Sequence, residues 1–121
     1  MTKRVLCIED QADNRRIVRD LLTSVGFEVI EAVKGDEGVS TAEREKPDLI
    51  LMDIQLPGID GYEATRRIKA NPALAHIPII VVTSYALSGD EEKARSAGCD
   101  AYIAKPFDAM ELLSMVRRYT G

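Results

Sequence analysis

The chain has 121 residues, of which 45% are hydrophobic and 30% are charged, and this length is typical of one globular domain with one core. The 16 lysines plus arginines against 20 aspartates plus glutamates give a net charge of -4, which argues against a nucleic-acid-binding surface. Cys7, Cys99 and the single histidine, His76, offer neither a disulfide framework nor a zinc site. No apolar stretch is long enough for a signal peptide or a membrane span, so we expect a soluble, cytoplasmic protein.

Five short apolar runs lie along the sequence, each of the length of a strand rather than a helix. The first, third and fourth runs are continuously apolar, as expected of strands covered on both faces, whereas the second alternates with Glu28 and Glu31 and is typical of an edge strand. The predicted strands are residues 5–8, 29–32, 49–52, 79–82 and 101–104.

The segments between these runs carry helical signals. Residues 14–25 give the clearest pattern, a single apolar stripe followed by Gly26 where a left-handed cap is expected. The stripe consists of Ile17, Val18, Leu21, Leu22 and Val25.

Four further helices complete the alternation of strand and helix. Residues 60–63 and 88–91 resemble capping boxes, and the helix opened by the first should stop near Asn71. Residues 108–111 open the last helix, and a weaker helix spans residues 36–45. The buried face of the last helix is expected to be Leu112, Leu113, Val116 and Tyr119.

Strands that alternate with helices must run parallel, because each helix returns the chain to the starting edge of the sheet through a right-handed crossover. With the second strand at an edge and the first and third in the centre, the strand order 2-1-3-4-5 fits. This predicts an α/β fold of the flavodoxin-like class, a doubly wound five-stranded parallel sheet with helices on both faces. Ligands bind such sheets at the switch point between strands one and three.

Polar residues follow the predicted strand ends. Glu9 and Asp10 follow the first strand, Asp53 the third, Thr83 the fourth and Lys105 the fifth. Converging carboxylates repel each other unless a cation joins them, so a hard divalent ion, magnesium above all, is the expected occupant. A metal, a lysine and a hydroxyl group around one more carboxylate favour a phosphoryl site, with Asp53 as acceptor through an aspartyl phosphate.

These residues resemble the receiver domains of two-component response regulators, the CheY-like family. The resemblance covers residues 3–119, and we expect residues 1–121 to form a single receiver domain with no output domain. The chain looks especially like stand-alone receivers of the DivK type. The motifs that carry the resemblance are Glu9-Asp10, residues 49–57 followed by Gly58 and Gly61, Thr83-Ser84, and Lys105-Pro106-Phe107.

The resemblance implies a metal site and a phosphoacceptor. Asp53 takes a phosphoryl group from a histidine of a sensor kinase or a histidine phosphotransferase. Asp10, Asp53 and the backbone carbonyl of Gln55 bind Mg²⁺ directly, and Glu9 acts through a bound water. Lys105 pairs with the phosphate oxygens.

The resemblance also implies a conformational switch. The peptide bond between Lys105 and Pro106 is expected to be cis and to aim the ammonium into the site. Thr83 is expected to move to the phosphate, and Tyr102 to turn inward into the space that Thr83 leaves. Gln55 and Tyr85 occupy positions that tune the lifetime of the phosphorylated state.

The expected function is that of a bacterial response regulator in a phosphorelay, which catalyses only its own phosphotransfer and dephosphorylation and is otherwise no enzyme. Besides the kinase or phosphotransferase, its partner is a downstream protein that reads the face made by the fourth helix, the fifth strand and the fifth helix. Direct binding to nucleic acid and insertion into a membrane are not expected. The fourth helix offers only alanines for core contact, which suits a moving element.

Three other functions share parts of this pattern. A flavodoxin-like redox carrier needs a hydroxyl- and glycine-rich phosphate loop where this chain has Glu9-Asp10. A degenerate receiver that serves only as a binding adaptor is the closer rival, although the intact acceptor, acid pair and lysine argue against it. A phosphatase of the aspartyl-phosphate type needs a second aspartate at the position of Gln55.

Overall fold

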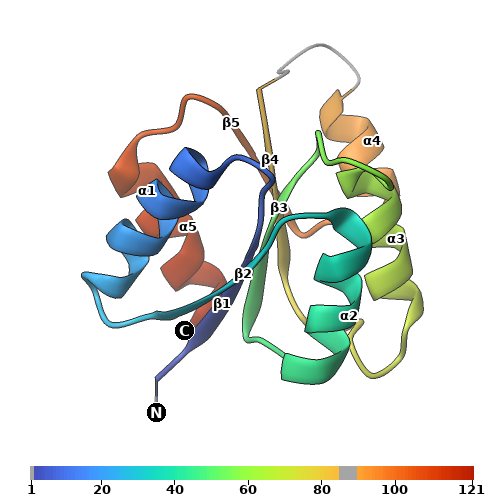
Figure 1. Ribbon diagram of the computed structural model, residues 1–121, viewed down its shortest axis with the longest axis horizontal. Coiled ribbons are helices and arrows are strands. Elements are labelled where there is room, and N and C mark those ends of the chain that lie inside the picture. The colour runs from blue at the N-terminus through green and yellow to red at the C-terminus, as the bar shows by residue number, and fades with distance from the viewer. Residues whose placement is uncertain (1, 85–89) are drawn as a thin grey trace.

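The computed structural model describes residues 2–84 and 90–121. In it, strands and helices alternate strictly along the chain, as the sequence predicts (Figure 1). The elements are β1 (Arg4–Ile8), α1 (Ala12–Thr23), β2 (Glu28–Ala32), α2 (Gly35–Glu45), β3 (Leu49–Asp53), α3 (Gly61–Ala70), β4 (Ile79–Thr83), α4 (Asp90–Ser96), β5 (Ala101–Ala104) and α5 (Ala109–Thr120).

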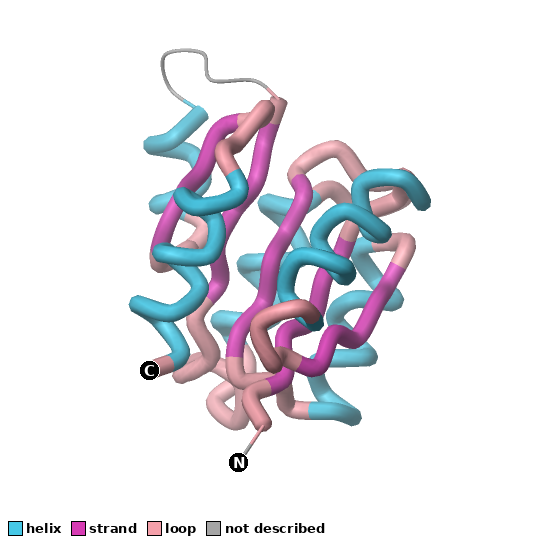
Figure 2. The backbone as a smooth tube through the Cα atoms, turned by 90° about the vertical axis from the view of Figure 1, so that its left-hand side faces the viewer, coloured by secondary structure: helices cyan, strands magenta, loops and turns pink. Residues whose placement is uncertain are grey.

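The strands form one parallel sheet in the order β2-β1-β3-β4-β5, which confirms the predicted topology and the position of β2 at an edge. Figure 2 looks onto the side of the sheet that α1 and α5 cover. In the centre of the sheet, Cys7 of β1 is paired with Glu31 of β2 on one side and with Leu51 of β3 on the other. This register brings the carboxyl ends of β1 and β3 together at the switch point.

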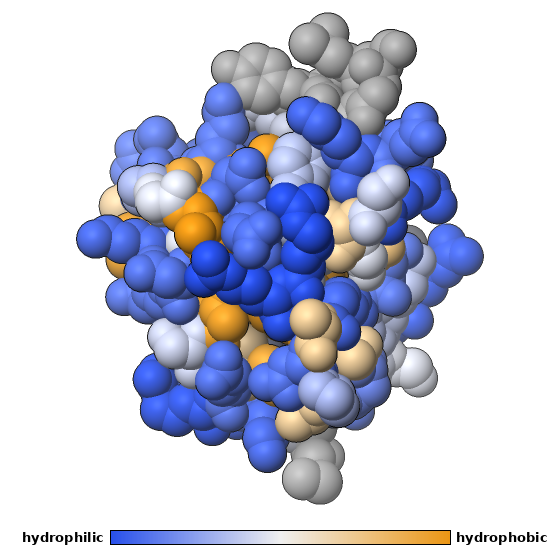
Figure 3. All heavy atoms as spheres, turned by 90° about the vertical axis from the view of Figure 1, so that its right-hand side faces the viewer, coloured by the Kyte–Doolittle hydropathy of each residue, from blue (hydrophilic) through white to orange (hydrophobic). Residues whose placement is uncertain are grey.

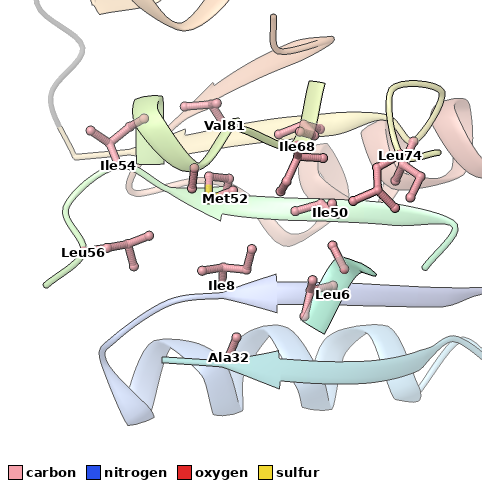
Figure 4. Close-up of a cluster of buried hydrophobic side chains, with 14 of the residues drawn as sticks. Leu6, Ile8, Ala32, Ile50, Met52, Ile54, Leu56, Ile68, Leu74 and Val81 are labelled. Carbon is pink, nitrogen blue, oxygen red and sulfur yellow. The ribbon is translucent and has the colours of Figure 1, made fainter. Parts of the chain in front are cut away.

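The core has two halves, one on each face of the sheet. Helices α2, α3 and α4 cover one face, where side chains of alternate strand positions form the cluster in Figure 4. Helices α1 and α5 cover the other face over the remaining strand positions. Fully buried side chains include Ile50 and Ile68 in the first cluster and Ile103 and Leu112 in the second. Both cysteines are free thiols.

Helix α1 departs from the predicted stripe. Val18 and Leu22 are buried, but Ile17 is 58% exposed and Val25 is 38% exposed, so these two residues of the expected apolar stripe do not lie in the core. Val25 lies beyond the last helical turn, and Ile17 lines a cavity instead of packing against the sheet. Gly26 has φ +95°, which confirms the left-handed conformation expected after this helix.

Helices α3 and α5 begin at their predicted caps, whereas α1 begins and ends two residues earlier than the predicted residues 14–25. The Asp60 carboxylate accepts a hydrogen bond from the Glu63 N–H at 2.9 Å, and α3 ends before Asn71. The Asp108 carboxylate caps α5 by accepting from the N–H of Met110, two residues further on, at 3.3 Å. The second expected capping box begins with Ser88, which lies outside the described residues.

The outer surface of the layer formed by α2, α3 and α4 is largely hydrophilic, with small apolar areas between polar side chains (Figure 3). Among the described helices, none is long and apolar enough to cross a membrane.

Candidate functional site

The strand ends bring the predicted acidic residues together. Glu9 and Asp10 follow β1, and Asp53 ends the neighbouring strand β3. One carboxylate oxygen from each of these three residues lies within 4.8 Å of the other two. Glu9 is 4% exposed and Asp53 is 8% exposed. The switch point of the sheet is therefore a compact, largely buried acidic cluster.

Lys105 supplies the positive charge of the cluster. Its Nζ lies 2.7 Å from Glu9 Oε1 and 3.7 Å from Asp53 Oδ1. The peptide bond that joins it to Pro106 is cis, as expected. Burial acts to lower the pKa of Lys105, but the hydrogen bond to Glu9 and the charge of Asp53 raise it above its ordinary value. The ammonium therefore stays charged and bridges the two carboxylates.

The carboxylate of Glu9 is fixed from two sides. It accepts a hydrogen bond from Lys105 and another, at 3.0 Å, from the N–H of Gln11 at the start of α1. Burial favours the neutral acid, but these two donors outweigh it and hold the pKa of Glu9 below its usual range. Glu9 is thus an ionised group whose hydrogen bonds satisfy it within the protein.

The pKa values of Asp53 and Asp10 are raised, in contrast to that of Glu9. Burial raises the pKa of Asp53 from 3.8 to about 6, and the nearby charge of Glu9 adds to the shift, while Lys105 and the backbone N–H of Gln55 act against it. Burial also raises the pKa of Asp10, and its hydrogen bond to Glu9 contributes. The cluster carries more negative charge than Lys105 alone compensates, so an added cation would stabilise its ionised form.

Gly61 lets α3 begin against the end of β3. Its N–H donates to the carbonyl of Ile54 at 2.9 Å. A Cβ atom at this position would lie 2.2 Å from the carbonyl oxygen of Asp53 and 2.8 Å from the Cα of Ile54. Only glycine fits at this close approach, which holds the backbone directly after the candidate acceptor.

A cavity of about 520 Å³ opens beside the cluster on the face of the sheet that α1 and α5 cover. Its walls are mostly apolar and include Ile17 of α1 and Phe107 of the loop before α5. Asp53 and Lys105 also line it. A reacting group can therefore reach Asp53 from this side.

Thr83 and Tyr102 lie toward the opposite face. Thr83 ends β4, is 1% exposed and accepts a backbone hydrogen bond from the Lys105 N–H at 2.7 Å. Tyr102 is half-buried against the first core cluster and is paired in register with Val81, two residues before Thr83. Since side chains alternate along strands, Thr83 and Tyr102 share one face of the sheet. Gln55 is exposed just after β3, and Tyr85 lies outside the described residues.

Sequence patterns did not reveal one residue that contacts the acid pair, Arg15, or the residue that holds it, Glu31. Arg15 of α1 donates from Nη1 to the carbonyl oxygen of Glu9 at 2.9 Å and from Nε to Glu31 Oε1 at 3.2 Å. Periodicity does not mark such a contact. The available signal was the position of Arg15 one turn into the helix that follows the acid pair, beside an edge strand whose penultimate residue is Glu31.

Comparison with known proteins agrees with this geometry. Residues 5–117 match the family model of the response regulator receiver domain. The chain is 44% identical over 121 residues to the polar-differentiation response regulator DivK of Brucella ovis, an alignment that covers 100% of this chain and 98% of the relative. It is 43% identical to DivK of Brucella anthropi over the same shares of both chains.

Solved structures give the same result. The receiver domain of the sensor histidine kinase PA1611 from Pseudomonas aeruginosa, with a magnesium ion coordinated in its active-site cleft, is 40% identical with a TM-score of 0.93, over 100% of this chain and 99% of that one. The chemotaxis response regulator CheY4 of Vibrio cholerae is 24% identical over 98% of this chain and 99% of that one. Its TM-score of 0.92 shows a shared fold. With the receiver model matching nearly its whole length, the chain belongs to the family of response regulator receiver domains, signalling domains of two-component phosphorelays.

Proposed function

We propose that Asp53 accepts a phosphoryl group from a phosphohistidine of a sensor kinase or histidine phosphotransferase, in a reaction that depends on Mg²⁺. The observation that carries this proposal is the convergence of three carboxylates and one ammonium at the switch point of the sheet. The cavity beside Asp53 supports it, because it leaves room for a donor to approach.

The residues of the cluster fit a magnesium ion. They offer the hard oxygen ligands that this ion prefers, and the pKa of Asp53 is raised first by burial and then by the charge of Glu9. We assign Asp10, Asp53 and the backbone carbonyl of Gln55 as direct ligands. Glu9 is assigned a contact through water, because its carboxylate already accepts hydrogen bonds from Lys105 and Gln11. The magnesium ion in the PA1611 receiver domain is consistent with this assignment.

The transfer itself needs little from the protein beyond alignment and charge compensation. A carboxylate oxygen of Asp53 bonds to phosphorus while the bond from phosphorus to the histidine nitrogen breaks, and the imidazole leaves with that electron pair. Bound magnesium supplies positive charge that offsets repulsion between the carboxylates and the phosphoryl oxygens. Lys105 stabilises the phosphoryl oxygens after shifting from its present partner Glu9, and loss of the phosphoryl group to water regenerates Asp53.

Phosphorylation then changes the packing of side chains in the domain. The phosphoryl group adds about -1.5 to -2 charges at pH 7 together with strong acceptor oxygens. We assign Thr83 and Lys105 as the groups that bind them, and Tyr102 as the side chain that turns inward when Thr83 moves. The face made by α4, β5 and α5 carries the signal to a downstream protein, and unchanged amide exchange on this face after phosphorylation would count against that assignment.

The proposal is tested by incubating the protein with a small phosphodonor such as acetyl phosphate and measuring the intact mass. We expect the mass of one phosphoryl group to be added in the presence of Mg²⁺, and not after chelation by EDTA or in Asp53→Asn. Asp36→Asn is the matched control, an exposed aspartate in the first turn of α2, and should be modified like the wild type. A wild-type chain that gains no mass would be an adaptor instead.

A further inference from the structure

We infer that Arg15, supported by Glu31, is a positioning residue that holds the acid pair Glu9-Asp10 in the geometry that binds the metal. This inference rests on the proposed function, because it concerns the same site. Arg15 contacts neither the carboxylates of the cluster nor Asp53 in the hydrogen bonds of the described residues. It acts through the backbone of Glu9.

Both backbone groups of Glu9 depend on the edge strand β2. The Glu9 N–H donates to the carbonyl of Ala32 at 3.0 Å, which extends the pairing of β1 and β2 by one residue. The Glu9 carbonyl accepts from Arg15 Nη1 at 2.9 Å, and Arg15 Nε is held by Glu31 of β2 at 3.2 Å. The peptide unit that leads from Glu9 to Asp10 is therefore fixed by the guanidinium.

The chemistry of arginine suits this role. Its planar group presents several N–H donors in a fixed fork, so one side chain can hold a carbonyl and a carboxylate at the same time. The Arg15 side chain is 18% exposed and that of Glu31 is 28% exposed, which protects their ion pair from full solvent screening. A lysine has a single nitrogen on a flexible stem and cannot reproduce both contacts in fixed geometry.

The positioning role and long-range electrostatics predict opposite changes in Mg²⁺ affinity when Arg15 is replaced. Removing a cation near an acidic cluster should make a divalent cation bind more tightly if only charge matters. Loosening the peptide that carries Asp10 should make it bind more weakly, as is found when outer-shell partners of metal ligands are removed. The direction of the change in affinity therefore separates the two explanations.

The experiment compares Arg15→Met and Arg15→Lys with Arg19→Met. Arg19 lies one turn further along α1 and pairs with the other oxygen of Glu31 at 3.0 Å, and none of the hydrogen bonds in the described part of the chain links it to Glu9. Arg15→Met and Arg19→Met change the net charge equally, and Arg15→Lys leaves it unchanged. Mg²⁺ affinity is measured by calorimetric titration, with thermal unfolding as the check that each variant is folded.

We expect Arg15→Met and Arg15→Lys to weaken Mg²⁺ binding by about 10-fold or more, and Arg19→Met to leave it unchanged or slightly tighter. In metal-free protein, the Glu9 amide should exchange faster with solvent in both Arg15 variants and at the wild-type rate in Arg19→Met. Should Arg15→Met be unfolded, Arg15→Lys decides the question.

Unchanged or tighter Mg²⁺ binding in both Arg15 variants would overturn the inference, as would equal weakening in Arg19→Met. The phosphodonor assay keeps this outcome distinct from failure of the proposed function. A wild-type chain that binds Mg²⁺ but gains no phosphoryl group refutes phosphotransfer, while the amide exchange of Glu9 still tests the positioning role in metal-free protein.

Discussion

Asp53 shows how burial sets the chemistry of a single side chain. It is 8% exposed, close to the ionised Glu9, and only partly compensated by Lys105 at 3.7 Å. Burial and the charge of Glu9 raise its pKa to about 6, which makes the metal-free carboxylate costly to ionise. The acceptor is therefore a group that gains from any cation placed beside it.

This shift predicts a pH-dependent gain in stability for Asp53→Asn in metal-free protein. Because the folded state binds the Asp53 proton more tightly than the unfolded chain does, ionisation lowers wild-type stability as pH rises from about 4 to about 6. The variant avoids this loss, so above pH 6 it should be more stable than the wild type by about 1–3 kcal/mol. Urea unfolding at pH 4 and pH 7.5 measures the difference, which should nearly vanish at the lower pH.

Added Mg²⁺ provides the control for this prediction. It should stabilise the wild type at pH 7.5 and have little effect on the variant, since a ligand stabilises only the folded state that binds it. Equal stability of the two proteins at pH 7.5 without metal would show that ionisation of Asp53 does not lower the free energy of unfolding.

Two glycines of the chain should respond differently to alanine. At Gly61 a Cβ would lie 2.2 Å from the Asp53 carbonyl oxygen, whereas at Gly26 nothing lies within 4 Å and only the φ of +95° is unfavourable. We expect Gly26→Ala to cost about 1–2 kcal/mol of unfolding free energy and to leave phosphorylation intact. Gly61→Ala should cost a further 1 kcal/mol or so and slow phosphorylation, because the backbone after Asp53 must shift. Urea unfolding and the phosphodonor assay check both, and normal phosphorylation of Gly61→Ala would contradict the close approach.

At the scale of elements, the sequence predicted β1, β3 and β4 well because these strands are buried on both faces. A continuous apolar run such as residues 79–82 leaves little choice of structure, and the alternating run at Glu28 correctly indicated an edge strand. The same patterns placed Glu9, Asp10, Asp53, Thr83 and Lys105 at one edge, where the structure has them. Their roles in phosphotransfer stay predictions.

What the sequence could not predict depends on distances between elements. The stripe on α1 included Ile17, but periodicity defines a helix face and not how far the sheet beneath it extends. The sequence also did not show that Lys105 sits closer to Glu9 than to Asp53. Arg15 was missed because a side chain that holds a backbone carbonyl produces no periodic pattern in the sequence.

Helix α4 should be the least protected of the helices that cover the sheet on its side. Among its described side chains only Ala94 is buried, whereas α3 buries Ala64, Thr65 and Ile68. Low apolar burial predicts low local stability, so amides of residues 91–96 should exchange at least about tenfold faster than those of α3. A tenfold difference in exchange rate corresponds to about 1.4 kcal/mol of local unfolding free energy. Hydrogen exchange followed by mass spectrometry tests this, and equal protection would argue against α4 as the moving element.

At the scale of the whole molecule, the sheet separates two halves of the core. Ile68 belongs to the cluster under α3, and Ile103 belongs to the cluster under α1 and α5. Each Ile→Val change should cost about 0.5–1.5 kcal/mol, and the two costs should add within about 0.5 kcal/mol because the sites share no cluster. Ile50 and Ile79 are register partners in one cluster and should couple instead. Urea unfolding of single and double variants measures both pairs, and coupling across the sheet would contradict the division.

Phosphotransfer to one particular carboxylate is the central claim, and chemical mapping tests it most directly. After incubation with acetyl phosphate and Mg²⁺, borohydride reduces an aspartyl phosphate to homoserine, which peptide mass spectrometry can locate. Homoserine is predicted at position 53, in amounts that fall when Mg²⁺ is chelated. Conversion of Asp10 instead, or no conversion anywhere in a folded, metal-loaded protein, would contradict the assignment of Asp53 as the phosphoacceptor.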